Sequence, residues 1–283
     1  AGLSLINIDD FTLEGAGPEA TVLINTSTSA CISVGNSREL NLTNFAINLD
    51  PIPTIQGTIT SISIAGGLAT CDFTTHAGYP QLTTTNYGKM HRCATLFYGS
   101  NDKMIQGIQW FGPVAEQNVI RVDDGHGQLK LHESYALHLQ IGDEVAIPIN
   151  QGGFPIALRN SQNVRLEGIT IYASESLGIS ARYMSGEVYM KKVVIKRGPI
   201  PAGATQVPLF STNADGMQYF FSGGNLTMDQ CDFGFMGDDG VNISTQPLVV
   251  HSILSPTSIK VMTSGSELQN MVNGSSAGDV VRA

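Results

Sequence analysis

One arrangement of apolar residues recurs along the chain: an apolar residue, one residue, an apolar residue, two residues, then an apolar residue, one residue and an apolar residue. The alternation of two places both apolar side chains on one face of a strand, and the two-residue step marks a bend between strands. The helical spacing of three and four does not fit these short segments, which are rich in Asn, Thr and Gly. We identify five copies, at 6–13, 40–47, 164–171, 188–195 and 226–233.

Copies that bury an apolar face only against neighbouring copies build a solenoid. We therefore predict an all-β fold, a right-handed parallel β-helix in which each copy belongs to one coil. The third and fourth copies are 24 positions apart, about one coil, and the fourth and fifth are 38 positions apart. The Pro- and Gly-bearing segment 197–212 lies in the longer interval, and we expect it to form a surface loop.

The interval between the second and third copies is too long for a loop inside a compact fold. Segments within it, such as GTITSISIA and GDEVAIPI, are typical of short strands. We predict three regions: first coils of the β-helix at 1–56, an inserted small β-barrel or β-sandwich at 57–150, and continuing coils with the candidate site at 151–283. In this arrangement Ile47 and Val164 belong to adjacent or near-adjacent coils.

Charge and cysteine content exclude several classes of function. The formal net charge is −9 and no run of Lys or Arg occurs, so the footprint of a nucleic-acid-binding protein is missing. An acidic surface also argues against polyanionic substrates, unless a local basic cleft overrides it. The apolar runs are too short for a membrane span. No C-x-x-C pair is present, which argues against zinc, and a bond between Cys71 and Cys93 is left open.

The two ends of the sequence resemble interior coils. The chain enters a strand-like segment by Leu5 and finishes on AGDVVRA, which itself resembles the start of a strand. An open coil exposes unpaired backbone and apolar interior, and terminal repeats are normally capped. We expect the chain to belong to a longer protein, or its coil ends to be covered by another subunit.

Three aspartates form the densest group of candidate chemistry. Asp215 and Asp238 are 23 positions apart, close to one coil, so Asp215 and the pair Asp238–Asp239 should lie close together on neighbouring coils. Neighbouring glycines permit turn conformations and close approach of a substrate. These glycines are Gly216, Gly237 and Gly240.

Carboxylates that crowd together repel one another, so at least one should have a raised pKa and keep its proton near neutrality. Hydrolysis of a glycosidic bond needs such a pair, an acid for the leaving oxygen and a base for water. We expect one solvent-open cleft with at least one carboxyl separation of about 6.5–9.5 Å, the spacing of inverting enzymes. A calcium site and plain Asp-Gly turns are the alternatives.

The motifs around these aspartates resemble those of β-helical glycoside hydrolases. The N-A-D segment ending at Asp215 and the G-D-D segment ending at Asp239 are similar to the N-T-D and G-D-D of family 28, the polygalacturonases. That family's later G-H-G and R-I-K segments have no counterpart after Asp239.

The resemblance is greater to glycoside hydrolase family 110, the exo-acting α-1,3-galactosidases. It runs in patches over most of 40–245. The similar segments are NFAINLDPIPTIQGTITSI (44–62), IGDEVAI (141–147), NVRLEGITIYASESLGIS (163–180) and DGMQYFFSGGNLTMDQCDFGFMGDDGVNI (215–243). The resemblance implies a β-helix with an inserted barrel, an inverting reaction and no cofactor or metal.

The resemblance also suggests roles for individual residues. By analogy with polygalacturonases, Asp238 would be the acid, and Asp215 with Asp239 the bases. Gln56, Gln218 and Asn242 are candidate substrate contacts. Arg182 and Arg197 could also contact the substrate, although solvated surface is the default interpretation for both. The family has His, Arg and His where this chain has Gln218, Gly223 and Ser244. The fold and the acid pair of the family are therefore expected in this chain more firmly than its specificity for galactose is.

These observations predict an inverting glycoside hydrolase, resembling an exo-α-galactosidase, that acts on an oligo- or polysaccharide and is secreted, periplasmic or on the cell surface. Two alternatives remain. A polysaccharide lyase or other uronan-modifying β-helix enzyme would use Lys, Arg or Tyr as base. A non-catalytic glycan-binding β-helix, such as an adhesin or tailspike segment, would fit the missing His and Arg.

Overall fold

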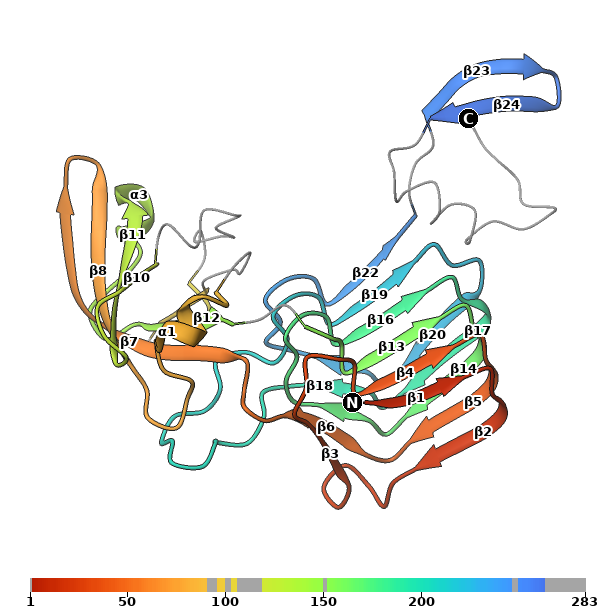
Figure 1. The fold of residues 1–283 in the computed structure, drawn as a ribbon, viewed down its shortest axis with the longest axis horizontal. Coiled ribbons are helices and arrows are strands. Elements are labelled where there is room, and N and C mark those ends of the chain that lie inside the picture. Colours follow the sequence, from red (N-terminus) through yellow and green to blue (C-terminus); the bar gives the residue numbers. More distant parts are fainter. Residues whose placement is uncertain are drawn as a thin grey trace.

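The fold is all-β with parallel sheets in a computed structural model that describes residues 2–90, 96–99, 103–105, 119–149, 152–245 and 249–262 (Figure 1). Most strands of the described residues belong to three parallel sheets, which we name sheets A, B and C. Sheet A contains β1 (Leu3–Ile6), β4 (Ile32–Gly35), β13 (Ile156–Arg159), β16 (Ile179–Arg182), β19 (Met217–Phe220) and β22 (Val241–Ser244).

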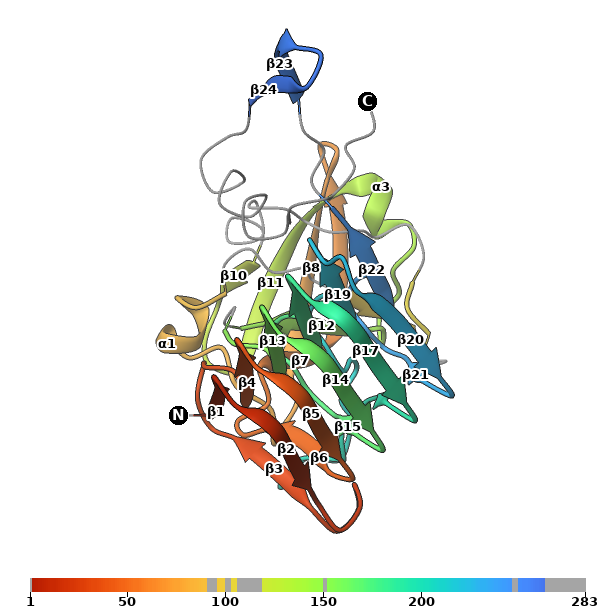
Figure 2. The ribbon, with the colours of Figure 1, turned by 90° about the vertical axis from the view of Figure 1, so that its right-hand side faces the viewer.

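After each strand of sheet A the chain continues into sheet B and then sheet C, and we call one such passage a circuit. Sheet B contains β2 (Asp9–Glu14), β5 (Arg38–Thr43), β14 (Gln162–Glu167), β17 (Ser185–Lys191) and β20 (Asn225–Asp229). Sheet C contains β3 (Val22–Asn25), β6 (Ala46–Leu49), β15 (Thr170–Ile171), β18 (Val194–Ile195) and β21 (Asp232–Phe233). The chain runs through A, B and C in turn, and each circuit adds a strand to each sheet (Figure 2).

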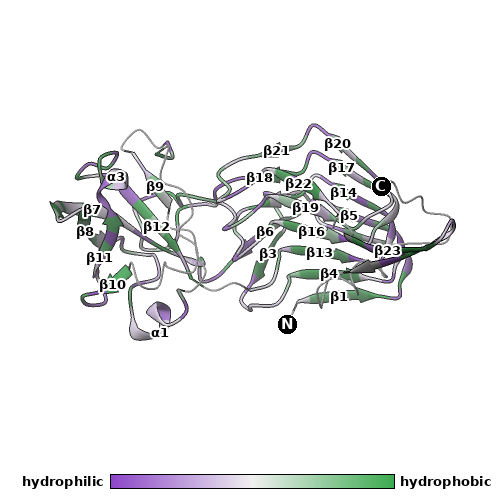
Figure 3. Ribbon diagram, turned by 90° about the horizontal axis from the view of Figure 1, so that it is seen from above, coloured by the Kyte–Doolittle hydropathy of each residue, from purple (hydrophilic) through white to green (hydrophobic). Residues whose placement is uncertain are grey.

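The recurring apolar positions stack in register between these circuits. In sheet B, Val164 pairs with Leu40 on one side and with Val188 on the other, and Val188 pairs with Leu226. The pairs are parts of one apolar core that also takes in residues of sheets A and C. Figure 3 shows both hydrophobic and hydrophilic residues along the parallel strands, as alternation between an inner and an outer face requires.

The bend between sheets A and B has a fixed backbone conformation. A residue with positive φ follows the sheet A strand in successive circuits, at Asn7, Asn36, Asn160, Tyr183 and Phe221. Asn adopts this left-handed region more readily than most residues with a Cβ. The Asn residues interspersed between the apolar runs therefore serve as bends in the first circuits.

The first predicted copy of the apolar pattern, at 6–13, is out of register. Phe11 pairs with Leu40, whereas the prediction placed Ile6 opposite Leu40. Ile6 instead ends β1, pairs with Gly35 and is 43% exposed. The spacing misled because residues 15–21 lengthen the bend between β2 and β3, while Ile6 and Ile8 reproduce the expected alternation by coincidence.

The interval between the second and third copies forms an antiparallel sheet. Its order is β10 (Val119–Arg121), β11 (His126–His132), β8 (Leu68–Thr75), β7 (Thr54–Ala65), β12 (Glu144–Pro148) and β9 (Leu96–Tyr98). Two short helices, α1 (Thr84–Tyr87) and α3 (Glu133–Ala136), accompany it. It has its own apolar core, and it lies to one side of the parallel sheets (Figure 1).

The predicted barrel or sandwich is wrong for the described residues, which form one open sheet with edges at β10 and β9. The prediction that Ile47 and Val164 lie on adjacent circuits is confirmed. Strand β14 pairs directly with β5, and β15 pairs directly with β6, although the antiparallel sheet separates them in sequence.

Near the end of the described chain, β23 (Val249–Ser255) and β24 (Ser258–Met262) form an antiparallel hairpin. The AGDVVRA segment and Cys93 lie outside the described residues, and Cys71 is buried with a free thiol. None of the helices in the described ranges has the length and apolar character needed to cross a bilayer.

Candidate active site

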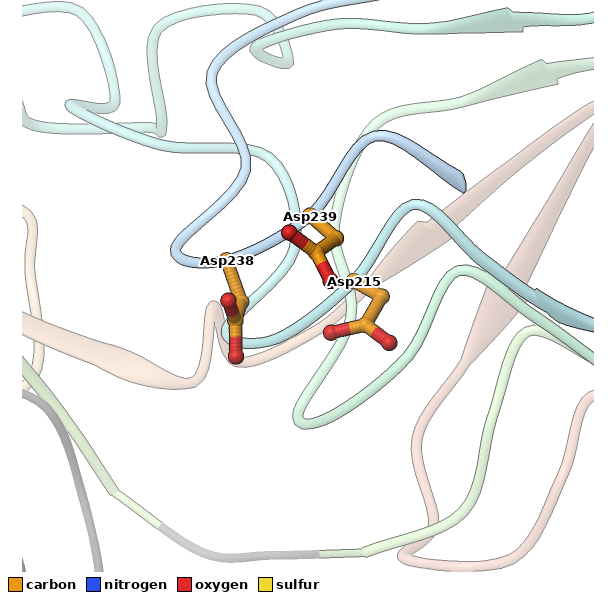
Figure 4. Close-up of side chains that lie close together, drawn as sticks. All are labelled: Asp215, Asp238 and Asp239. Carbon is orange, nitrogen blue, oxygen red and sulfur yellow. The ribbon is translucent and has the colours of Figure 1, made fainter. Parts of the chain in front are cut away.

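The three predicted aspartates lie together where two neighbouring circuits enter sheet A. Asp215 comes just before β19, and Asp238 and Asp239 come just before β22. One oxygen of each of the three side chains lies within 4.8 Å of the other two (Figure 4). The prediction that one coil of spacing brings these carboxylates together is confirmed.

The backbone pairing between β19 and β22 shows which aspartate lies one circuit after Asp215. Met217 pairs with Val241, so the residue one circuit after Asp215 is Asp239 rather than Asp238. The N–H of Gly216 donates to the carbonyl oxygen of Asp239 at 2.8 Å, which fixes the two segments against each other.

Two of the flanking glycines, Gly216 and Gly237, are required by close packing between neighbouring circuits. A Cβ on Gly237 would lie 2.3 Å from the carbonyl oxygen of Asn213, and a Cβ on Gly216 would lie 2.7 Å from that of Gly240. None of these three glycines has a positive φ. Gly216 and Gly237 are needed because neighbouring circuits approach too closely for a side chain, whereas a Cβ on Gly240 would have only an ordinary contact, at 3.7 Å from the side chain of Met236.

The three carboxyl groups differ in exposure. Asp215 is only 3% exposed, whereas Asp238 and Asp239 are exposed, so the cluster opens to solvent on one side. Two surface depressions, lined by polar side chains around Arg38 and around Tyr189, do not include the aspartates. The predicted cleft is neither of these two depressions.

Burial and mutual repulsion raise two of the pKa values. Desolvation raises the pKa of Asp215, and the charge of Asp239 adds to the rise. Desolvation likewise raises the pKa of Asp238, with further contributions from Asp215 and Asp239. The expectation that at least one carboxyl group keeps its proton more readily than usual is confirmed in direction.

Two of the predicted substrate contacts adjoin this cluster. Gln218 and Asn242 pair with each other on β19 and β22, and their side-chain amides partly offset the rise in the pKa of Asp215. Even so, Oδ2 of Asp215 has no hydrogen-bond partner of normal geometry among the described residues. A buried carboxylate oxygen without a donor is positioned to bind something else.

Gln56, the third predicted contact, has a different role. Its side chain is fully buried, its Nε2 donates to the carbonyl oxygen of Val207 at 2.9 Å, and its Oε1 accepts from the N–H of Leu209 at 3.0 Å. These two hydrogen bonds hold the 197–212 segment against β7. The prediction of a substrate contact is wrong because neither polar atom of the side chain is left facing solvent.

Polar residues that had no recognised signal in the sequence hold the turn beneath Asp215. Asn213 is buried, and its Nδ2 donates to the carbonyl oxygen of Glu175, one circuit away, at 3.1 Å. Ser174 and Thr212 are both fully buried and bridge the same two segments. Asn213 could have been found from the N-A-D motif, because the N-T-D motif of the polygalacturonases has Asn at the same position.

The converging oxygens of the three carboxyl groups lie closer together than the predicted carboxyl separation. The converging oxygens lie within 4.8 Å, which is shorter than the spacing of about 6.5–9.5 Å expected for an inverting pair. This compact arrangement also fits the calcium alternative, because two oxygens bound to one Ca²⁺ at up to about 2.6 Å are at most about 5.2 Å apart. Asp215, Asp238 and Asp239 would then be the ligands.

Replacing Asp215 with Asn is expected to stabilise the fold at neutral pH. The pKa of Asp215 in the folded chain lies above its ordinary value of 3.8, so its stabilising contribution is present below that value and is lost as pH rises through the folded-state pKa. At pH 7 the buried charge is costly, and Asn removes it. We expect a gain of about 1–3 kcal/mol in the free energy of unfolding at pH 7.

Urea unfolding at several pH values measures this gain. The difference between the variant and the native protein should shrink as pH falls and vanish below about pH 3, where Asp215 is neutral in both the folded and the unfolded state. Asp232→Asn, at an exposed carboxyl group outside the cluster, is the matched control and should change little. A native protein as stable as the Asp215→Asn variant at pH 7 would contradict the account.

A comparison with protein-family models matches none of them, and a comparison with curated proteins also finds no match.

Proposed function

We propose that this chain is a glycoside hydrolase, and that its three parallel sheets are the faces of a right-handed parallel β-helix with the antiparallel sheet as an insertion between coils. The observation that carries the proposal is the convergence of Asp215, Asp238 and Asp239, two of them with raised pKa values. An acid and a base side by side are what hydrolysis of a glycosidic bond requires.

Asp238 is the acid in this proposal. It is exposed, so it can reach the oxygen of the leaving group, and its raised pKa favours the protonated form. Its proton passes to the leaving oxygen as the bond to the anomeric carbon breaks, and its carboxylate is reprotonated from solvent after each turnover.

Asp215 and Asp239 are the bases that activate water. Asp215 is too deeply buried to reach an anomeric carbon directly, but its unpartnered Oδ2 can accept a proton from a bound water molecule. Attack by water inverts the anomeric configuration, whereas attack by a carboxylate in a two-step reaction retains it. Burial of Asp215 therefore favours inversion, although the short separation of the oxygens is nearer to the retaining arrangement.

The substrate class follows from the resemblance to the α-1,3-galactosidases, and no cofactor is needed. We propose an α-galactosidic linkage in an oligo- or polysaccharide, with Gln218 and Asn242 holding the sugar beside the carboxylates. Such a substrate fits a secreted, periplasmic or cell-surface protein. Gln218, Gly223 and Ser244 depart from the family pattern, so the sugar would be held differently from the way it is held in that family.

Activity on a panel of galactans and galacto-oligosaccharides tests the proposal. We expect release of reducing sugar with no new ultraviolet absorbance. Absorbance from a new double bond would identify a lyase instead. Binding without any turnover would identify a non-catalytic glycan-binding protein.

A further inference from the structure

Two arginines stack on the outer face of sheet A, and one of them, Arg182, contacts Gln218, whose side chain also hydrogen-bonds to Asp215. Arg159 on β13 and Arg182 on β16 are paired positions on adjacent parallel strands, which lie about 4.8 Å apart. Their neighbours in the strands, Leu158 and Ala181, belong to the apolar core, so both arginines extend from the opposite, outer face.

Neither arginine forms an ion pair within the described part of the chain. Elsewhere, Arg38 pairs with Asp9 at 2.8 Å, and Arg165 pairs with Glu167 at 2.5 Å. Nη2 of Arg182 instead donates to the neutral amide oxygen of Gln218 at 3.1 Å. Burial, with a smaller contribution from the like charge of Arg159, lowers the pKa of Arg182. Two guanidinium groups without a counter-charge are notable in a protein with a net charge of −9.

Three buried polar atoms without hydrogen-bond partners in the described part of the chain belong to Arg182, to Ser180 on the same strand and to Asp215. Within the described residues, Oγ of Ser180, Nε of Arg182 and Oδ2 of Asp215 are buried and have no hydrogen-bond partner. Ser180 and Arg182 lie on the same face of β16, and Ser180 pairs with Gln218, three residues after Asp215. Buried donors and acceptors are normally satisfied, so partners from outside the chain are indicated.

We propose that the sugar bound at the carboxylates carries a negatively charged substituent, a carboxylate or a sulfate ester, which Arg182 and Arg159 bind. This inference rests on the proposed function for the location of the sugar. A guanidinium group binds planar or tetrahedral oxyanions through two parallel N–H donors, which matches the free Nε of Arg182. The side chain turns outward as the anion replaces its one hydrogen bond to Gln218.

The two arginines also solve an electrostatic problem of the site. An anionic sugar would be repelled by three carboxylates, and the positive charges of Arg182 and Arg159 would offset that repulsion at the substituent that they bind. The raised pKa of Asp238 favours its neutral form, which would reduce the repulsion further. The acidic net charge of the protein therefore does not exclude an anionic substrate, because the local charge at Arg159 and Arg182 has the opposite sign.

Binding measurements test the inference without relying on turnover. Isothermal titration calorimetry on the native chain would compare methyl α-galactopyranoside, galacturonic acid and galactose 6-sulfate at low salt. We expect at least one charged sugar to bind about tenfold more tightly than the neutral one, as charge-assisted hydrogen bonds would give. The preference should weaken as salt is added. The two charged probes distinguish a carboxylate from a sulfate as the group that is recognised.

Substitutions assign the preference to the arginines. Arg182→Gln should abolish the preference, and Arg159→Gln should reduce it. Arg182→Lys should leave part of it, since the charge stays and the paired donors are lost. Arg165→Gln, at an arginine already paired with Glu167, is the control and should leave the preference intact.

The outcomes separate this inference from the proposed function. Equal binding of all three sugars, no binding of a charged sugar, or a preference that persists when both arginines are replaced overturns the inference. A preference that depends on Arg182, in a protein that hydrolyses no galactoside, overturns the proposed function and supports the anion site.

Discussion

Asp238→Asn is expected to lower the rate of glycoside hydrolysis by about 10²–10⁴-fold, the usual contribution of a general acid. Asn is nearly isosteric with Asp and removes only the titratable proton. Asp238 is exposed, so the change leaves the packing between circuits untouched. Reducing-sugar assays on the substrate that the native protein cleaves best would measure the loss.

The control for Asp238 is Asp232→Asn, which alters an exposed carboxyl group on β21 outside the cluster and should retain full activity. Full activity of Asp238→Asn would exclude Asp238 as the acid. Loss of folding together with loss of a bound cation would instead favour the hypothesis that the three aspartates bind calcium.

Gln56→Leu is expected to destabilise the fold by roughly 2–4 kcal/mol, because it removes the partners of the Val207 carbonyl oxygen and the Leu209 N–H. Leu209 is itself buried, so its N–H would be left without a replacement from water. The segment that follows leads to Asp215. We therefore expect a lower rate of hydrolysis as well as a lower free energy of unfolding.

Urea unfolding and the activity assay together measure the effects of Gln56→Leu. The matched control is Gln162→Leu, at an exposed position on β14, which should change the free energy of unfolding by no more than about 0.5 kcal/mol. A variant at Gln56 as stable as this control would show that the side chain does not fasten the 197–212 segment.

Burial periodicity made most of the parallel strands predictable. Leu40, Val164, Val188 and Leu226 were placed in register correctly because a strand that buries one face must alternate apolar and polar residues. Ile6 was misplaced because the same alternation arises at an exposed strand end. The spacing of apolar residues within one strand does not reveal how long the following bend is. The length of that bend determines the register in which the strands pair.

The carboxylate cluster was predictable because a spacing of about one coil brings residues together in any parallel solenoid. Arg182 was considered as a substrate contact but interpreted as solvated surface, and Arg159 was not linked to the cluster, because an outward-facing residue on a strand has no distinguishing pattern in sequence. Gln56 was misread for a related reason. A polar residue at a junction has the same appearance in sequence whether it is buried against a backbone or open to a ligand.

The anomeric form of the first sugar released tests the account most directly. Proton NMR during hydrolysis of an α-1,3-linked galactoside detects each anomer before the two interconvert in solution. The account predicts that β-galactose forms first, because water held by the buried Asp215 and by Asp239 attacks from the face opposite the leaving group. Initial release of the α-anomer, or a protein that releases no sugar from any neutral or charged α-galactoside, would contradict it.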